Sequence, residues 1–142
     1  MLRFTRRSEY GMMALAFLAR KPKAYCSVRE IHGELGLPRR LLAEILKALC
    51  QEEMVEGVRG PGGGYRLTVD AGTIPLSRVV EALDGTLRIT ECSKGGDCRW
   101  LEDCTIRGGM SQVAARIHGV LDEFTVAEVA FRLRPGRRGV EV

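Results

Sequence analysis

The sequence is poor in the residues from which many enzyme sites are built, and it contains no long hydrophobic run. It has two histidines in 142 residues, and no C-x-x-C pair or Ser/His/Asp set, which argues against an enzyme such as a thiol oxidoreductase. No apolar run approaches the roughly 18 residues of a membrane span, and no signal peptide opens the chain. We therefore expect a cytoplasmic non-enzyme without a membrane partner, whose cysteines stay reduced.

Charge is distributed unevenly along the chain. Residues 1–66 carry 12 Lys and Arg against 7 Asp and Glu, whereas residues 67–131 carry 6 against 10. The last eleven residues return to a net charge of +3. A basic first half beside an acidic second half favours a module that binds a polyanion, joined to a second functional region. A chance excess of charge on solvated faces is the alternative.

The first 36 residues predict two amphipathic helices. Between Arg6 and Ala19, apolar residues recur at helical spacing; they are Tyr10, Met13, Ala14, Phe17 and Leu18. In the stretch "CSVREIHGELG", Ser27 is suited to cap a short second helix and Glu30 to complete a capping box. Gly36 suits the C′ position at which that helix would end.

A third helix is expected after a three-residue link, with Pro38 at its N1 position. Its apolar stripe comprises Leu41, Leu42, Ile45, Leu46 and Leu49. Its other side carries Arg39, Arg40, Ala43, Glu44 and Lys47. Two short helices joined by a tight glycine-containing turn match a helix-turn-helix, whose second helix lays its N-terminal residues into the DNA major groove. A plain three-helix bundle with a charged outer face is the alternative.

The next segment, "MVEGVRGPGGGYRLTVD", predicts a β-hairpin with a glycine-rich tip. Apolar residues flank the tip on both sides; they are Val55, Val58, Tyr65, Leu67 and Val69. Behind a helix-turn-helix, such a hairpin is interpreted as the wing of a winged helix. Gly60, Gly62 and Gly63 allow the tip backbone to approach a phosphate or a narrow minor groove, and Arg59 supplies charge. A nucleotide-binding loop is disfavoured, because neither a Lys-Ser/Thr pair nor a helix follows the glycines.

The second half predicts a short helix and a long one. The short helix lies in "TIPLSRVVEALDG" and ends at Gly85, and the following "TLRITEC" is compatible with a strand. The long helix carries apolar residues at intervals of 4, 3, 4, 3 and 4, the a/d pattern of a coiled-coil seam; they are Ile106, Met110, Val113, Ile117, Val120 and Phe124. This seam packs either on its own chain or on its copy in a second chain. A dimer is favoured, because a helix-turn-helix typically reads two half-sites with two-fold symmetry.

The stretch "ECSKGGDCRWLEDCT" contains Cys92, Cys98 and Cys104, with five residues between each cysteine and the next. Zinc sites favour C-x2-C pairs, because a tight turn presents two sulfurs to one ion. The wider spacing and the two glycines in the loop fit thiolates held around an iron–sulfur cluster better. Unligated thiols or a thiol switch are the alternatives. Cys26 and Cys50 are isolated and are interpreted as buried or incidental thiols.

The motif "RGPGGGY" after a helix-turn-helix, with a three-cysteine loop before a long helix, resembles the iron–sulfur winged-helix transcriptional regulators, the family that includes IscR and NsrR. The resemblance extends from about Leu2 to about Val129. It implies that the three cysteines of the loop bind a cluster, either 2Fe–2S or 4Fe–4S. It also implies that residues 39–44 begin the recognition helix, and that Arg59 and the glycines after it form the wing contact with DNA.

Two positions depart from the IscR pattern. IscR-like members use a histidine three residues after the last cysteine as the fourth ligand, where this chain has Arg107, which stays protonated and cannot ligate a metal. The serine and glutamate that read bases in IscR-like recognition helices are here Arg40 and Ala43. The operator is therefore expected to differ from that of IscR, and Arg40 is suited to a bidentate contact with guanine.

The fourth cluster ligand must then come from elsewhere. His118 would lie roughly 20 Å along the helix from Cys104, whereas His32 stays open. NsrR-like members have an acidic residue at the position of Glu9, and in those proteins this residue ligates the cluster of the partner subunit. The resemblance thus implies Glu9 of the partner as a weak, exchangeable oxygen ligand, which would leave one iron open to attack.

The sequence as a whole predicts a mainly α protein with a small β wing. It divides into a winged helix-turn-helix (1–70), a connecting helix and cysteine loop (71–104), a dimerisation helix with a short following helix (105–131) and a disordered basic tail (132–142). The expected function is that of a homodimeric repressor whose binding to a palindromic DNA operator depends on a cluster that senses nitric oxide, redox state or iron–sulfur status. The same fold with a zinc site or a thiol switch is the alternative. The expected DNA contacts are Arg39, Arg40, Ala43, Glu44, Lys47, Arg59, Gly60, Gly62, Gly63 and Tyr65.

Overall fold

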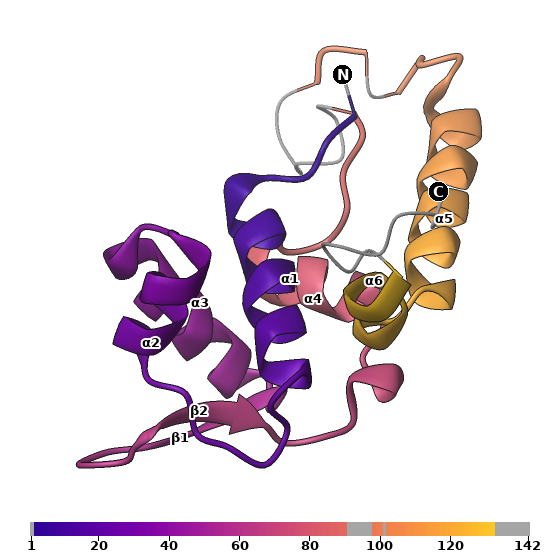
Figure 1. Cartoon of the computed structure of the whole chain (residues 1–142). Helices are drawn as coiled ribbons and strands as arrows, with labels where there is room; N and C mark the ends of the chain where they lie inside the picture. The colour runs from indigo at the N-terminus through magenta and orange to yellow at the C-terminus, as the bar shows by residue number, and fades with distance from the viewer. Residues whose placement is uncertain (1, 91–97, 101, 133–142) are drawn as a thin grey trace.

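The computed structural model describes residues 2–90, 98–100 and 102–132 (Figure 1). Over these residues the elements are α1 (Arg6–Ala19), α2 (Val28–Leu35), α3 (Arg39–Gln51), β1 (Val55–Val58), β2 (Gly64–Leu67), the short 3-10 helix η1 (Ala71–Thr73), α4 (Leu76–Asp84), α5 (Arg107–Glu123) and α6 (Val126–Arg132). The two strands pair antiparallel with each other. The prediction of a mainly α fold with a small β wing is confirmed.

The start of α2 follows the predicted cap. The hydroxyl of Ser27 accepts a hydrogen bond from the backbone N–H of Glu30 at 3.0 Å, and the carboxylate of Glu30 binds Lys21 at 3.2 Å. Gly36 ends the helix with a φ of +69°, in the left-handed region that favours glycine. The prediction for Pro38 is wrong by one residue, because its non-helical backbone (φ −55°, ψ 121°) makes it the N-cap of α3 rather than the first helical residue.

Helix α1 occupies the centre of the fold and contacts α2, α3, α4, α6 and β2. The core around it consists of large apolar side chains that are fully buried, among them Leu15, Leu18, Ile31, Leu42, Ile45, Leu46, Leu49, Met54, Ile74 and Val79. At Gly11, an added Cβ would overlap the side chain of Leu83, so the absence of a side chain at this position allows α1 to pack closely on α4. The end of α4 is thereby seated directly on α1.

Helix α5 lies along α4 with none of its side chains fully buried, although Leu121 is half-buried against the core. Polar contacts hold the two helices together: His118 Nε2 lies 2.7 Å from Glu81 Oε1, and the buried hydroxyl of Ser77 donates to Asp122. Four residues of the predicted seam are exposed in the single chain, namely Ile106 (61%), Val113 (46%), Val120 (53%) and Phe124 (40%). At these positions the seam does not pack on its own chain.

The strand suggested for "TLRITEC" is absent over residues 86–90, and residues 91 and 92 lie outside the described part. A strand needs a neighbour for its backbone N–H and C=O groups, and within the described residues the sheet contains only β1 and β2. Of the predicted tail, residues 133–142 also lie outside the described part. Over the residues that are described, none of the helices has both the length and the apolar character to cross a membrane.

Candidate nucleic-acid interface and metal-binding loop

Helix α3 is anchored by its apolar stripe and presents the opposite side to solvent. Leu42, Ile45, Leu46 and Leu49 are fully buried, while Leu41 is half-buried. Four of the five predicted DNA-contacting side chains on this helix are exposed: Arg39, Arg40, Glu44 and Lys47. Ala43 is half-buried. The helix therefore offers a charged, outward-facing N-terminal turn, as a recognition helix requires.

Two charged side chains of this surface are engaged within the protein. Arg40 is 95% exposed, and its Nε lies 3.5 Å from Oε1 of Glu44, one turn further along α3. The second carboxylate oxygen of Glu44 lies 3.9 Å from Nη1 of Arg7 on α1. Glu44, which the sequence suggested as a DNA contact, thus sits between two guanidinium groups.

The tip of the wing is built around glycine. Gly60 and Gly62 adopt φ values of +99° and +74°, and a Cβ at either would meet nothing within 4 Å. A Cβ at Gly63 would instead overlap the carbonyl oxygen of Val58. Gly63 is therefore needed for the packing of the wing itself, whereas Gly60, Gly62 and the exposed Arg59 are open to an approaching ligand.

The wing is joined to the helix-turn-helix by backbone pairing. The N–H of Cys26 donates to the carbonyl of Tyr65, and the N–H of Tyr65 donates to the carbonyl of Cys26, each at 2.8 Å. Tyr65 is half-buried and packs against the core. Cys26 is fully buried, as predicted, and burial raises the pKa of its thiol. Cys50 is half-buried.

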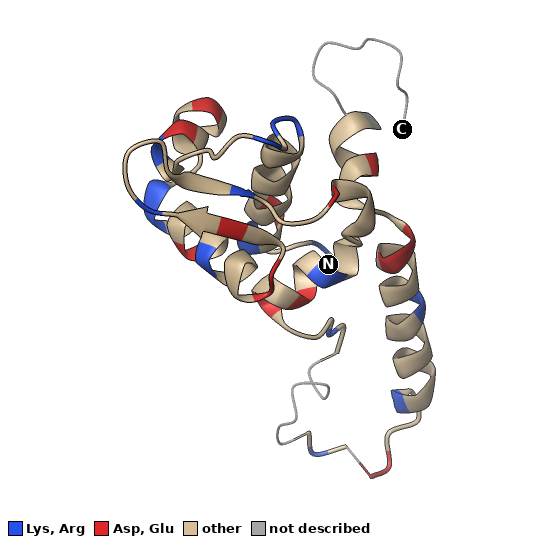
Figure 2. Cartoon of the chain, turned by 90° about the horizontal axis from the view of Figure 1, so that it is seen from below, with Lys and Arg blue, Asp and Glu red and all other residues tan. Residues whose placement is uncertain are grey.

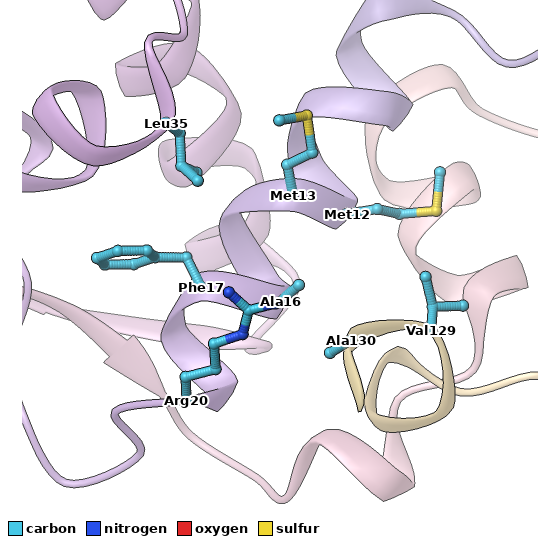
Figure 3. A pocket seen from close by; sticks show the side chains of 8 residues that line it. All are labelled: Met12, Met13, Ala16, Phe17, Arg20, Leu35, Val129 and Ala130. Carbon is cyan, nitrogen blue, oxygen red and sulfur yellow. The ribbon is translucent and has the colours of Figure 1, made fainter. Parts of the chain in front are cut away.

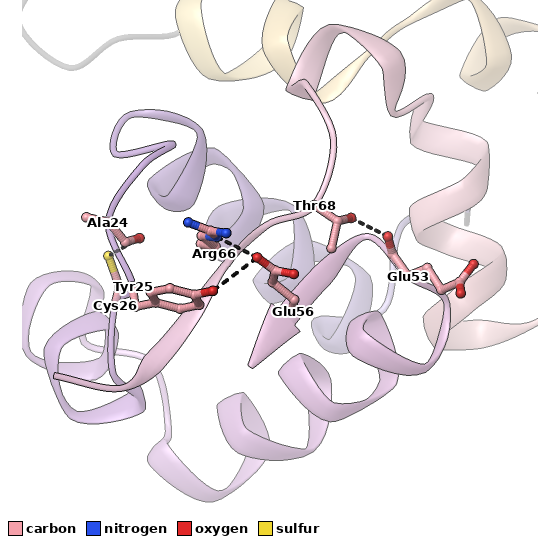
Figure 4. A network of polar contacts seen from close by, with 7 residues as sticks. All are labelled: Ala24, Tyr25, Cys26, Glu53, Glu56, Arg66 and Thr68. Atoms are coloured by element: carbon pink, nitrogen blue, oxygen red, sulfur yellow. Dashed lines mark hydrogen bonds and ion pairs between the residues drawn. The ribbon is translucent and has the colours of Figure 1, made fainter. Parts of the chain in front are cut away.

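A second set of contacts, here called the Glu56–Arg66 brace, joins the two strands near the base of the wing (Figure 4). Arg66 Nε lies 2.5 Å from Glu56 Oε1, the hydroxyl of Tyr25 donates to the same oxygen at 3.1 Å, and the Arg66 guanidinium lies 4.5 Å from the centre of the Tyr25 ring. The hydrogen bond from Arg66 and then that from Tyr25 lower the pKa of Glu56. This network is not among the contacts predicted from the sequence. The hairpin register could have indicated the pair, because it places Glu56 directly opposite Arg66.

Two of the predicted cluster ligands share a pocket. Cys98 and Cys104 are half-buried free thiols, and both line a pocket of about 370 Å³ together with Trp100, Asp103 and Arg107. Cys92 lies outside the described residues. Among the side chains that the structure describes, no three His, Cys, Asp or Glu residues are grouped closely enough to hold a metal ion. The pocket therefore brings two thiols together but does not by itself complete a site.

The candidates for the fourth ligand occupy different surroundings. Glu9 lies in the first turn of α1, half-buried, with its carboxylate 3.3 Å from Arg6. His32 Nδ1 lies 2.6 Å from the carbonyl oxygen of Leu37, so this ring helps to shape the turn after α2. His118 is engaged by Glu81 on α4. All three side chains therefore have a polar partner within one chain.

Positive charge is concentrated on the same part of the molecule as the helix-turn-helix. In Figure 2 the Lys and Arg positions gather over the half that contains α1, α2, α3 and the wing, whereas fewer lie along α4 and α5. This agrees with the net charge of residues 1–66, in which basic residues outnumber acidic ones by 12 to 7. Such a surface attracts a polyanion over several ångströms.

The family model and two relatives that match this chain are all described as transcriptional regulators. The family model described as "Rrf2: Iron-dependent Transcriptional regulator" matches residues 4–132. The HTH-type transcriptional regulator IscR of Vibrio vulnificus strain YJ016 is 30% identical over 129 residues, which cover 90% of this chain and 77% of that protein. IscR of Citrobacter koseri is 29% identical, with 90% and 79% covered.

Solved structures share the fold. IscR from T. potens superimposes with a TM-score of 0.72 at 23% sequence identity, covering 97% of this chain and 93% of that one. CymR, the global cysteine regulator of B. subtilis, superimposes with a TM-score of 0.71 at 22% identity, covering 92% and 97%. Both comparisons support the arrangement of helices and wing described above.

Proposed function

The chain belongs to the Rrf2 family of iron-dependent transcriptional regulators, and on that premise we propose that it is a cytoplasmic, homodimeric repressor whose operator binding is controlled by an iron–sulfur cluster. The cluster ligands are Cys92, Cys98, Cys104 and Glu9 of the partner subunit. The observation that carries the proposal is the shared pocket of Cys98 and Cys104, which lies directly before α5 in a chain whose other end is a winged helix-turn-helix.

The DNA-binding part of the proposal rests on exposure and charge. Arg39 and Arg40 stand at the N-terminus of α3, the end that a recognition helix inserts into the major groove. Arg59 and the open glycines of the wing reach the neighbouring backbone or minor groove. A two-fold dimer would place two such units on a palindromic operator.

The dimer is supported by two apolar surfaces that the single chain leaves uncovered. The first is the exposed seam of α5. The second is a groove of about 330 Å³ between α1, α2 and α6, lined by Met12, Met13, Phe17, Val129 and Ala130 (Figure 3). We propose that a second copy of the chain covers both, because apolar surfaces left exposed together on a soluble chain favour association.

The position of Glu9 fits this arrangement. Met12, Met13 and Ala16 follow Glu9 by three, four and seven residues on α1, which places all four on one side of the helix. A partner chain seated on the groove would therefore lie next to Glu9. That partner's cysteine loop, which directly precedes its α5, is the one that Glu9 would reach.

The residues present fit a thiolate-held cluster. Cys98 and Cys104 supply soft sulfur donors to one pocket, and Arg107, which also lines it, cannot act as a ligand. When bound, the cluster would supply iron that nitric oxide or oxygen can attack at the weakly held carboxylate position. The protein's part is to hold the thiolates and to limit access to them.

The cysteine segment follows α4 in the chain, and the end of α4 contacts the beginning of α1. Asp84 accepts hydrogen bonds from Thr5, at 2.6 Å, and from the buried hydroxyl of Ser8. These two residues form the beginning of α1, where Glu9 also lies. A change at the cluster would therefore act on the first turn of α1 from both subunits, and α1 packs on α3.

The experiment that tests the cluster is visible absorption of anaerobically purified protein. We expect a brown protein with iron and sulfide, and the absorption should be lost in Cys98→Ala but retained in Cys50→Ala. Colourless protein that contains stoichiometric zinc would contradict the proposal and favour the same fold with a zinc site.

A further inference from the structure

Glu44 lies between two arginines that belong to different helices. Its Oε1 is 3.5 Å from Nε of Arg40 on α3, and its Oε2 is 3.9 Å from Nη1 of Arg7 on α1. A lone carboxylate on a DNA-facing helix would be repelled by phosphates. Between two guanidinium groups its negative charge is compensated, so the three side chains together still carry a net positive charge.

Arg7 is itself fixed to the last turn of α4. Its Nε donates to the backbone carbonyl of Leu83 at 3.2 Å. One turn further along the same face of α1, Gly11 lies so close to Leu83 that an added Cβ would overlap its side chain. The position of Arg7 therefore depends on how the end of α4 sits on α1.

The contact with Glu44 leaves Arg40 suited to reading a base. Glu44 is met by Nε of Arg40, and the same guanidinium carries two terminal nitrogens that can act as a pair of donors. Such a pair matches the O6 and N7 acceptors of guanine. Because Arg40 is 95% exposed, it would otherwise lose rotamer freedom each time it bound.

We propose that Glu44 is a positioning residue that holds Arg40 in the orientation for guanine, and that Arg7 anchors Glu44 to the end of α4. Glu44 then contacts no base itself. The proposal rests on the proposed function as a DNA-binding regulator. It adds that the sequence preference of α3 depends on α4, the helix that leads toward the cysteine segment.

The test is binding-site selection from a randomised double-stranded DNA library by the full-length dimer. Wild type should select a guanine in each half-site, and Arg40→Ala should lose that preference. Glu44→Gln and Arg7→Gln should weaken discrimination at the same base pair by about twofold to fivefold, the range of an exposed ion pair. Arg6→Gln removes the same charge one residue away, where the contact is with Glu9, and should leave the preference unchanged.

Two outcomes would overturn the positioning role while leaving the proposed function intact. In one, Glu44→Gln changes the preference at a different base pair, such as a cytosine that a carboxylate reads directly. In the other, Arg7→Gln selects the same sequences as wild type and Arg6→Gln. Failure of the proposed function has a different signature: wild-type protein itself would select no sequence.

Discussion

Cys26 and Tyr65 exchange two backbone hydrogen bonds of 2.8 Å, although 38 residues lie between them along the chain. Cys26 directly precedes the cap of α2, and Tyr65 lies in β2, just after the wing tip. The wing and the helix-turn-helix are therefore joined by direct backbone pairing. Gly64 makes this possible, because a Cβ there would overlap the backbone of Cys26.

Gly64→Ala should detach the wing from α2. The new Cβ would overlap the Cys26 backbone, and the φ of +148° is one that alanine rarely adopts. We expect a loss of about 1–3 kcal/mol in the free energy of unfolding and weaker DNA binding, measured by urea denaturation and by fluorescence anisotropy. Gly33→Ala is the matched control, since its Cβ meets nothing within 4 Å on α2. Equal stability of Gly64→Ala and wild type would contradict the close approach.

The Glu56–Arg66 brace should make stability depend on pH in the acidic range. The pKa of Glu56 is lowered from its ordinary 4.5, first by Arg66 and then by Tyr25, so folding favours the charged carboxylate. The stabilisation is present above the unfolded pKa and is lost as the pH falls through the lowered folded pKa. We expect the difference in melting temperature between wild type and Glu56→Gln to be constant near neutral pH and to shrink well below pH 4.5. Glu34→Gln, on exposed α2 surface, should show no such trend, and a pH-independent difference for Glu56→Gln would argue against the brace.

The parts of the fold that sequence reasoning could predict depend on near neighbours. Ser27 and Gly36 mark the ends of α2 through local rules of capping and conformation. The pairing of Arg7 with Glu44, or of Asp84 with Thr5, depends on how helices cross, and no local period determines which charged side chains meet there. A strand after Gly85 was wrongly suggested because apolar and β-branched residues alone do not supply a neighbouring strand.

The candidate site was also predictable from the sequence only where it depends on residue spacing. The heptad spacing of α5 identified an apolar seam, but only the packing shows that Val113 and Val120 face away from the chain's own core. The spacing of the cysteines indicated ligands, and the structure brings Cys98 and Cys104 to one pocket. Glu9 as fourth ligand stays a prediction, because the contact would cross between two subunits.

Charges placed on the seam should dissociate the proposed dimer without unfolding the chain. Val113→Glu with Val120→Glu would put two unpaired charges into the interface, and one such buried charge costs about 3–5 kcal/mol, enough to weaken association more than about a hundredfold. Light scattering after size exclusion should give a monomer with unchanged helix content. Gln112→Glu adds a charge at an exposed position of α5 outside the seam and should remain dimeric. A dimer that tolerates both seam substitutions would place the interface elsewhere.

Replacing Glu9 should change the cluster but not the fold. We expect Glu9→Ala to bind a cluster with an altered visible spectrum and altered reactivity toward nitric oxide, because the proposed oxygen ligand would be lost. Asp103→Ala is the informative comparison, since Asp103 lines the same pocket as the cysteines within one chain. If Asp103→Ala alters the spectrum and Glu9→Ala leaves it as in wild type, the oxygen ligand comes from the loop itself.

The most direct test of cluster-controlled DNA binding is the affinity of one protein preparation for a selected operator duplex, measured anaerobically before and after the cluster is destroyed with nitric oxide. We expect the two affinities to differ by about 5-fold to 150-fold, the range of typical allosteric couplings. Cys98→Ala should bind like the cluster-free form before and after treatment. Equal affinities of the cluster-bound and cluster-free wild-type protein, at the same salt concentration, would contradict control by the cluster.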